Sequence, residues 1–229
     1  MGYILAIETS TTNCSVGLIR EGICEAFIEE NNGYTHAENL SVFIDDLLHL
    51  HHVDKTELEA IAVTKGPGSY TGLRIGVSTT KGICFALNLP LVSVNALDQM
   101  FLHHSLDEFK TENNLFIPML DARRMEVYMK TLNYQGKSIS TIEAKIIDEN
   151  SFDGLDAENI ILFGPGAEKF QELFQANSKI KIVLDILPSS QLMGSLVQQK
   201  FKNKQFEDVA YFEPFYLKEF VATTPKKQI

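Results

Sequence analysis

The first thirty residues alternate short apolar runs with polar turns, which is typical of β-strands. Residues 3–7 form one apolar run, and residues 15–20 and 23–29 follow with only Glu21-Gly22 between them. A two-residue connection that contains glycine indicates a β-hairpin. The pattern therefore predicts three consecutive strands at the start of the chain.

The hydrophobic period changes after residue 34. Thr35 and Glu38 have the spacing of a capping box, with Thr35 as the N-cap. Apolar side chains then recur every three or four residues, which predicts an amphipathic helix that ends near residue 50. The apolar stripe of this helix consists of Leu40, Phe43, Ile44, Leu47 and Leu48.

The remaining chain alternates strands with helices, and the opening pattern returns once. Apolar runs predict buried strands at 60–64 and 91–94, with helices over 71–87 and 95–110. Three strands are then predicted again, at 116–120, 126–132 and 139–147. Strands at 160–163 and 180–184 follow, with helices over 167–174 and 189–200, an extended aromatic segment at 211–220 and a frayed tail at 223–229.

Each half thus begins with three strands and continues as alternating helix and strand. This doubled order is the layout of the actin-like ATPase fold (ASKHA, ribonuclease H-like), an α/β fold with two duplicated subdomains. We expect an N-terminal subdomain over residues 1–110 and a C-terminal subdomain over residues 111–229.

An acidic residue, Glu8 or Asp121, stands at the first turn of each half. Catalytically active members of this fold bind phosphate at these two turns. The first turn offers hydroxyls but no glycine, and Arg123-Arg124 occupy the second, where close backbone approach would need small residues. A glycine pair before a helix could contact a nucleoside. The candidate residues of a degenerate nucleotide pocket are Glu8, Thr9, Ser10, Asp121, Gly164 and Gly166; the alternative is that all three segments are plain turns.

The net charge of the chain argues against one class of function, the binding of nucleic acid by the chain alone. With 20 basic and 30 acidic residues the net charge is −10, which is unfavourable for binding nucleic acid alone. The three cysteines form no C-x-x-C pair, and no apolar run approaches the ~18 residues of a membrane span. The first residues lack the basic region of a signal peptide. We expect a cytoplasmic protein without membrane contact.

The sequence GPGSYTGLRIG at residues 66–76 is neither a Walker A loop nor a dinucleotide-binding loop. From its residues it is a tight strand-to-helix turn with hydroxyl caps at Ser69 and Thr71. Together with residues 4–10, 60–63, 121–128 and 213–217, this loop closely resembles the TsaB (YeaZ) family, the dimerisation subunits of the bacterial machinery for tRNA threonylcarbamoyladenosine.

The resemblance implies the actin-like fold and a non-catalytic role without a cofactor. It implies pairing with a larger catalytic paralogue, TsaD, and a small ATPase, TsaE, which together transfer threonylcarbamoyl to N6 of adenosine 37 in tRNAs that read ANN codons. It also allows a homodimer when the chain is isolated, and tRNA contact only through the complex. We expect the partner interface to comprise Leu40, Phe43, Ile44, Leu47, Leu48, Gly72, Gly76 and Thr80, since small residues let another helix come close; the alternative is that the apolar stripe packs on the chain's own sheet.

No catalytic or metal-binding residue is assigned. The paralogue's metal-binding histidines, spaced His-x-x-x-His, correspond here to Ala96 and Met100. His49 and His52 share a helix face, but no Cys or Glu joins them at zinc spacing. Two alternatives stay open: a small-molecule kinase or ATPase of the same fold, which would need ATP and Mg²⁺ at Glu8 and Asp121, and a metallopeptidase.

Overall fold

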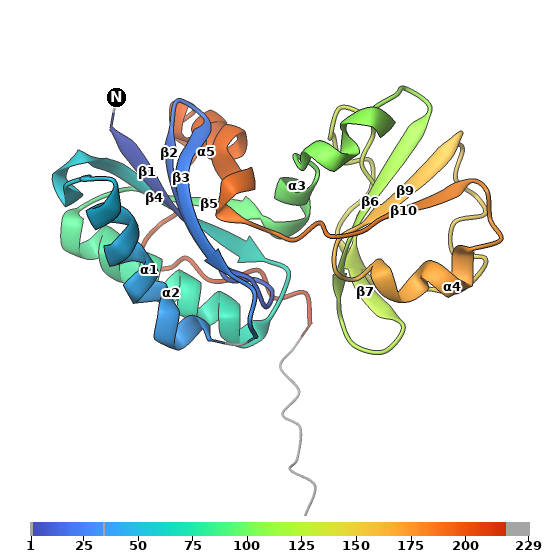
Figure 1. Ribbon diagram of the computed structural model, residues 1–229, viewed down its shortest axis with the longest axis horizontal. Coiled ribbons are helices and arrows are strands. Elements are labelled where there is room, and N and C mark those ends of the chain that lie inside the picture. Colours follow the sequence, from blue (N-terminus) through green and yellow to red (C-terminus); the bar gives the residue numbers. More distant parts are fainter. Residues whose placement is uncertain (1, 34, 219–229) are drawn as a thin grey trace, which may run out of the picture.

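The computed structural model describes residues 2–33 and 35–218, which form two five-stranded sheets (Figure 1). The first has the order β3-β2-β1-β4-β5 and the second β8-β7-β6-β9-β10, so the second repeats the first and the predicted duplication is confirmed. The strands are β1 (Tyr3–Glu8), β2 (Cys14–Arg20), β3 (Ile23–Glu30), β4 (Leu58–Gly66), β5 (Leu91–Asn95), β6 (Asn114–Asp121), β7 (Glu126–Met129), β8 (Glu143–Ile146), β9 (Asn159–Phe163) and β10 (Ile180–Val183).

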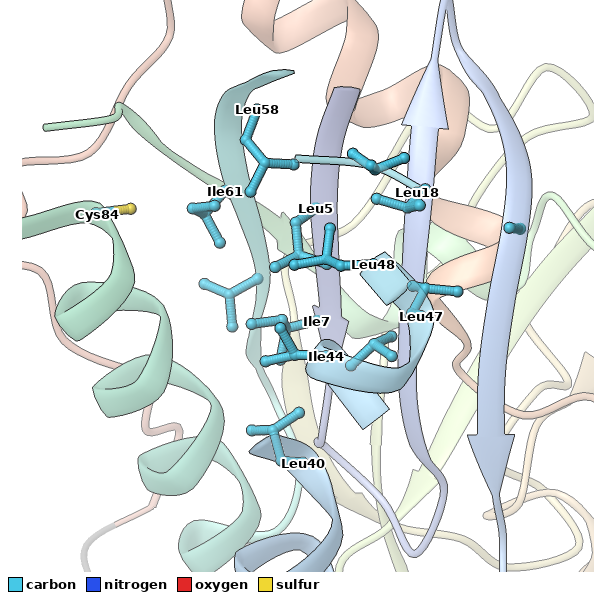
Figure 2. Packing of buried hydrophobic residues seen from close by; sticks show 14 of the residues in the cluster. Leu5, Ile7, Leu18, Leu40, Ile44, Leu47, Leu48, Leu58, Ile61 and Cys84 are labelled. Carbon is cyan, nitrogen blue, oxygen red and sulfur yellow. The ribbon is translucent and has the colours of Figure 1, made fainter. Parts of the chain in front are cut away.

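The first sheet is covered on both faces because its central strands alternate two sets of apolar side chains. Leu5 and Ile7 of β1 face the helices α1 (His36–Leu50) and α2 (Tyr70–Leu87), as Figure 2 shows for the α1 side. Ile4 and Ala6 face the opposite side, where the short helix η4 (Ser190–Met193) and α5 (Gly194–Lys202) pack. A strand between two helical layers reads as a continuous apolar run, which is the observed sequence.

The start of α1 differs from the predicted capping box. Thr35 is the N-cap residue, but its side chain makes no capping hydrogen bond. Its carbonyl oxygen instead accepts from the backbone N–H of Glu38 at 3.0 Å. The ring of His36, 2% exposed, lies with Nε2 2.8 Å from the carbonyl oxygen of Thr11. The first turn of α1 is therefore fixed by the contact between His36 and Thr11, which are distant in sequence, and not by a side-chain cap.

The helix predicted over 71–87 is confirmed as α2, and Ser69 caps it by accepting from the N–H of Gly72 at 3.2 Å. The helix predicted over 95–110 is broken into α3 (Ala96–Met100) and the 3₁₀ helix η2 (His104–Phe109). His103 at the break is extended and caps η2. Phe101 packs edge-on against Phe116 of β6, with ring centroids 5.1 Å apart.

The remaining elements are short. The connector after α1 contains η1 (Lys55–Glu57), and the helix predicted over 167–174 consists of η3 (Glu168–Phe170) and α4 (Gln171–Phe174). In the described part of the chain, no helix is long and apolar enough to cross a membrane.

After β10 the chain returns to the first sheet, which the predicted division into residues 1–110 and 111–229 did not include. Met193 and Val197 are fully buried with the apolar residues of β1, β4 and β5. Further on, the N–H of Phe215 donates to the carbonyl oxygen of Lys65 at 2.7 Å. Residues 189–218 therefore lie on the first sheet because they supply its second apolar cover. The frayed tail at 223–229 and the end of the aromatic segment lie outside the described residues.

Candidate functional site

The end of β1 and the turn after it contain three of the predicted pocket residues, Glu8, Thr9 and Ser10, and all three are buried. The carboxylate of Glu8 is fully buried and accepts a hydrogen bond from the backbone N–H of Ser10 at 2.5 Å. It also accepts from the hydroxyl of Thr64 and from the side-chain amide of Gln99. Burial raises the pKa of Glu8, and these hydrogen bonds oppose the rise. Three donors from separate segments of the chain therefore bind this carboxylate.

Glycines of the 66–76 loop pack directly on this turn. A Cβ at Gly68 would lie 2.2 Å from the carbonyl oxygen of Ser10, and one at Gly72 would lie 2.1 Å from that of Thr9. The N–H of Ser69 donates to the carbonyl oxygen of Ser10 at 2.6 Å. The space beside the first turn is thus filled by the start of α2.

The small residues Gly72, Gly76 and Thr80 make contacts within the chain, and their assignment to a partner interface stays a prediction. A Cβ at Gly76 would lie 2.2 Å from the hydroxyl oxygen of Thr9. The hydroxyl of Thr80 is fully buried and donates to the carbonyl oxygen of Gly76 at 2.8 Å. These small residues let α2 approach the β1–β2 turn of its own subdomain.

The apolar stripe of α1 is likewise directed inward (Figure 2). Four of its residues belong to the first hydrophobic core, and Phe43 is partly buried against the same cluster. Leu40, Ile44, Leu47 and Leu48 are buried on the chain's own sheet, which is the alternative that the sequence left open, and their part in a partner interface stays a prediction.

The second acidic turn, after β6, is open to solvent. The side chain of Asp121 is 56% exposed and forms a salt bridge with Lys169 at 2.5 Å. Arg123 and Arg124 both adopt positive φ angles, 77° and 52°, in positions that glycine usually fills. Lys169 also donates to the carbonyl oxygen of Arg124 at 2.7 Å. A lysine of the same subdomain therefore binds the acid that was predicted to face phosphate.

Gly164 and Gly166, which the sequence suggested as contacts for a nucleoside, lie beside this turn and face protein backbone. A Cβ at Gly164 would lie 2.5 Å from the carbonyl oxygen of Met119, and one at Gly166 would lie 2.7 Å from the carbonyl carbon of Leu120. The six predicted pocket residues thus form two groups, one on each sheet. Within residues 2–33 and 35–218, no hydrogen bond or salt bridge joins the two groups.

Ala96 and Met100 are both fully buried in the core that connects α3 with the second sheet. In the described residues, no group of three or more His, Cys, Asp or Glu side chains is arranged to hold a metal ion. Sequence reasoning missed Thr64 and Gln99, the partners of Glu8. A hydroxyl at the end of the apolar run AIAVT, and an amide inside an otherwise apolar helix start, were the available signals.

A family model and three similar proteins indicate the family of this chain. A family model described as "TsaD: tRNA N6-adenosine threonylcarbamoyltransferase" matches residues 30–226. The tRNA threonylcarbamoyladenosine biosynthesis protein TsaB of Haemophilus influenzae is 27% identical over 229 residues, covering 95% of this chain and 94% of its own. The solved structure of YeaZ from Pseudomonas aeruginosa has a TM-score of 0.77 at 27% identity, over 95% of this chain and 100% of its own. A tRNA N6-adenosine threonylcarbamoyltransferase of Phocaeicola vulgatus is 32% identical over 125 residues, which is 48% of this chain and 37% of that protein.

The full-length matches are therefore to TsaB and YeaZ, whereas the transferase matches over about a third of its own length. The solved structure of the activator of 2-hydroxyisocaproyl-CoA dehydratase from Clostridium difficile has a TM-score of 0.50 at 9% identity, over 89% of this chain and 97% of its own. This likeness and the two sheets of identical strand order confirm the duplicated actin-like fold. The chain belongs to the TsaB (YeaZ) family, whose members take part in the biosynthesis of tRNA threonylcarbamoyladenosine alongside TsaD-like proteins.

Proposed function

We propose that this chain is a non-catalytic subunit of the complex that makes N6-threonylcarbamoyladenosine at position 37 of tRNA, and that it binds and activates the catalytic paralogue TsaD together with TsaE. The proposal includes a homodimer of the isolated chain, contact with tRNA only through the complex, and a cytoplasmic location. It is supported by the relatives' names and by the two features of the N-terminal subdomain described next.

The first feature is the closed β1–β2 turn, and it carries the proposal. A carboxylate that positions Mg²⁺ must present oxygen atoms to the ion or to its water shell. Glu8 is fully buried and already accepts from Ser10, Thr64 and Gln99. This arrangement argues against the kinase or ATPase alternative, because the buried acid could present its oxygen atoms to an ion only by giving up hydrogen bonds from Thr64 and Gln99.

The second feature is the outer face of α2. Exposed residues recur there every three or four positions, and a Cβ at Gly82 would meet no atom within 4 Å. Phe85 is 86% exposed, which is unusual for a large aromatic ring. Small residues followed by an exposed ring suit close packing with a helix of another chain. We propose that TsaD docks on the face formed by Thr71, Arg74, Ser78, Gly82 and Phe85.

The test is co-purification of this chain with TsaD from the same organism. Phe85→Asp should abolish co-purification, because it places a charge where the ring would be buried. Ile146→Asp is the matched control, since Ile146 on β8 is 70% exposed on the other subdomain and should be tolerated. Both variants should keep the circular dichroism of the parent. Equal retention of TsaD by both variants would refute the docking face.

The non-catalytic role has a separate test. Calorimetry of the isolated chain with ATP and Mg²⁺, followed by an assay for ADP, should show no turnover. Steady ADP formation by the lone chain, lost in Glu8→Gln, would support the kinase alternative instead.

A further inference from the structure

A cavity of about 270 Å³ lies between the two subdomains, and its lining includes none of the residues predicted for a nucleotide pocket. Its polar lining comprises Lys65, Asn95, Asp98 and Lys200, and its apolar walls come from Val94, Ile142, Leu196 and Phe215. Lys65 and Asn95 stand at the carboxyl ends of the parallel strands β4 and β5. In open α/β sheets this edge is the usual position of a ligand.

The charges around the cavity are unbalanced. Asp98 is already neutralised by Lys130, whose side chain is 5% exposed and also donates to the hydroxyl of Ser138 at 3.0 Å. Among the described residues, neither Lys65 nor Lys200 forms a salt bridge. Lys200 donates to the carbonyl oxygen of Ser93 at 2.7 Å, which leaves two of its protons free.

The ammonium groups of Lys65 and Lys200 repel one another. The pKa of Lys200 is lowered, first by burial and then by the charge of Lys65, while Glu207 and Asp98 oppose this effect. Even with both acids counted, the three lysines leave an excess positive charge at the cleft. This stands out in a chain with a net charge of −10. Low-dielectric walls around charges of one sign concentrate their field on a small anion.

We propose that this cleft binds a small ligand through a phosphate group, with Lys65 and Lys200 as the two cationic contacts. The free N–H groups of the lysines would donate charge-assisted hydrogen bonds to phosphate oxygens. The apolar walls would contact whatever the phosphate carries. The volume admits inorganic phosphate whole, or the phosphate end of a nucleotide.

The experiment is calorimetric titration of the full chain at low ionic strength, with inorganic phosphate and, separately, with ATP in the absence of Mg²⁺. The parent chain should show saturable binding that weakens at least tenfold in the variant Lys65→Gln/Lys200→Gln. The control Lys202→Gln/Lys204→Gln removes the same charge from exposed positions at the end of α5 and should bind like the parent. Tighter binding of ATP than of phosphate would identify a nucleotide as the ligand, and equal binding would identify free phosphate.

A second measurement does not depend on the variants. In ¹⁵N-resolved spectra of the parent chain, phosphate should shift the amides of Lys65, Asn95 and Asp98 before others. The proposal would be overturned by an absence of saturation with both ligands, by equal weakening in both double variants, or by shifts confined to another part of the chain. None of these results depends on TsaD, so they leave the proposed docking separately testable.

Discussion

At the scale of single residues, Glu8 is the most constrained group of the candidate site. A carboxyl whose folded-state pKa lies above its unfolded value binds its proton more readily in the folded protein. Burial raises the pKa of Glu8 from its usual value of 4.5, in spite of the hydrogen bonds from Thr64 and Gln99. Glu8 therefore contributes stability that is fully present below pH 4.5 and is lost as the pH rises through its folded-state pKa.

Glu8→Gln should isolate this contribution, because glutamine does not titrate and every other titratable group is shared with the parent. The free energy of unfolding of the parent, measured in urea, should fall relative to that of Glu8→Gln between pH 4.5 and neutrality. A difference that stays constant over this range would show that folding does not shift the pKa of Glu8, and one that grows in favour of the parent would show that the carboxylate is stabilised as the anion.

At the scale of elements, α2 contains a matched pair of glycines with opposite surroundings. A Cβ at Gly72 would lie 2.1 Å from the carbonyl oxygen of Thr9, whereas one at Gly82 would meet open space. Gly72→Ala should therefore destabilise the protein by about 1–3 kcal/mol through overpacking. Gly82→Ala should stabilise it by roughly 0.5–1 kcal/mol, since alanine favours a helix more than glycine does.

Urea unfolding of both variants beside the parent checks this pair. Because the chemical change is the same, any effect of alanine on the unfolded chain is common to both. A similar free energy of unfolding for the two variants would contradict the close packing of α2 on the β1–β2 turn.

The positions of the helices and strands were largely predictable from the sequence, but the residues that each of them packs against were not. Apolar runs between turns identify the ten strands of the described residues, and the 3.6-residue period identifies α1 and α2, all within a few residues. The helix predicted over 95–110 breaks at His103, because Phe101 packs on Phe116 and no local signal marks that contact. The pattern of α1 is equally compatible with a core face and with an interface, so only the tertiary structure shows that Leu47 is fully buried.

The candidate site shows the same limit. Sequence placed an acid in each of the two turns, and both Glu8 and Asp121 lie there. Their partners come from distant segments: Gln99 stands 91 residues after Glu8, and Lys169 stands 48 residues after Asp121. Such pairings depend on how the layers pack, which a single sequence does not encode as a pattern.

At the scale of the whole molecule, the return of the chain after β10 joins its end to its beginning. Met193 is fully buried against the face of the first sheet that α1 and α2 leave uncovered. Its sulfur lies 3.9 Å from the hydroxyl of Thr64, the same hydroxyl that donates to Glu8. Residues 189–218 therefore support the turn formed by the first ten residues.

Met193→Ala should consequently lower the free energy of unfolding by about 2–5 kcal/mol, the usual cost of a cavity in a closed core. Met125→Ala removes the same side chain from a turn where it is 44% exposed, and it should change stability by no more than about 0.5 kcal/mol. Urea unfolding followed by circular dichroism measures both. If residues 189–218 only rested on the surface of the first sheet, the two variants would lose similar and small amounts of stability, and the N-terminal subdomain would not depend on the end of the chain.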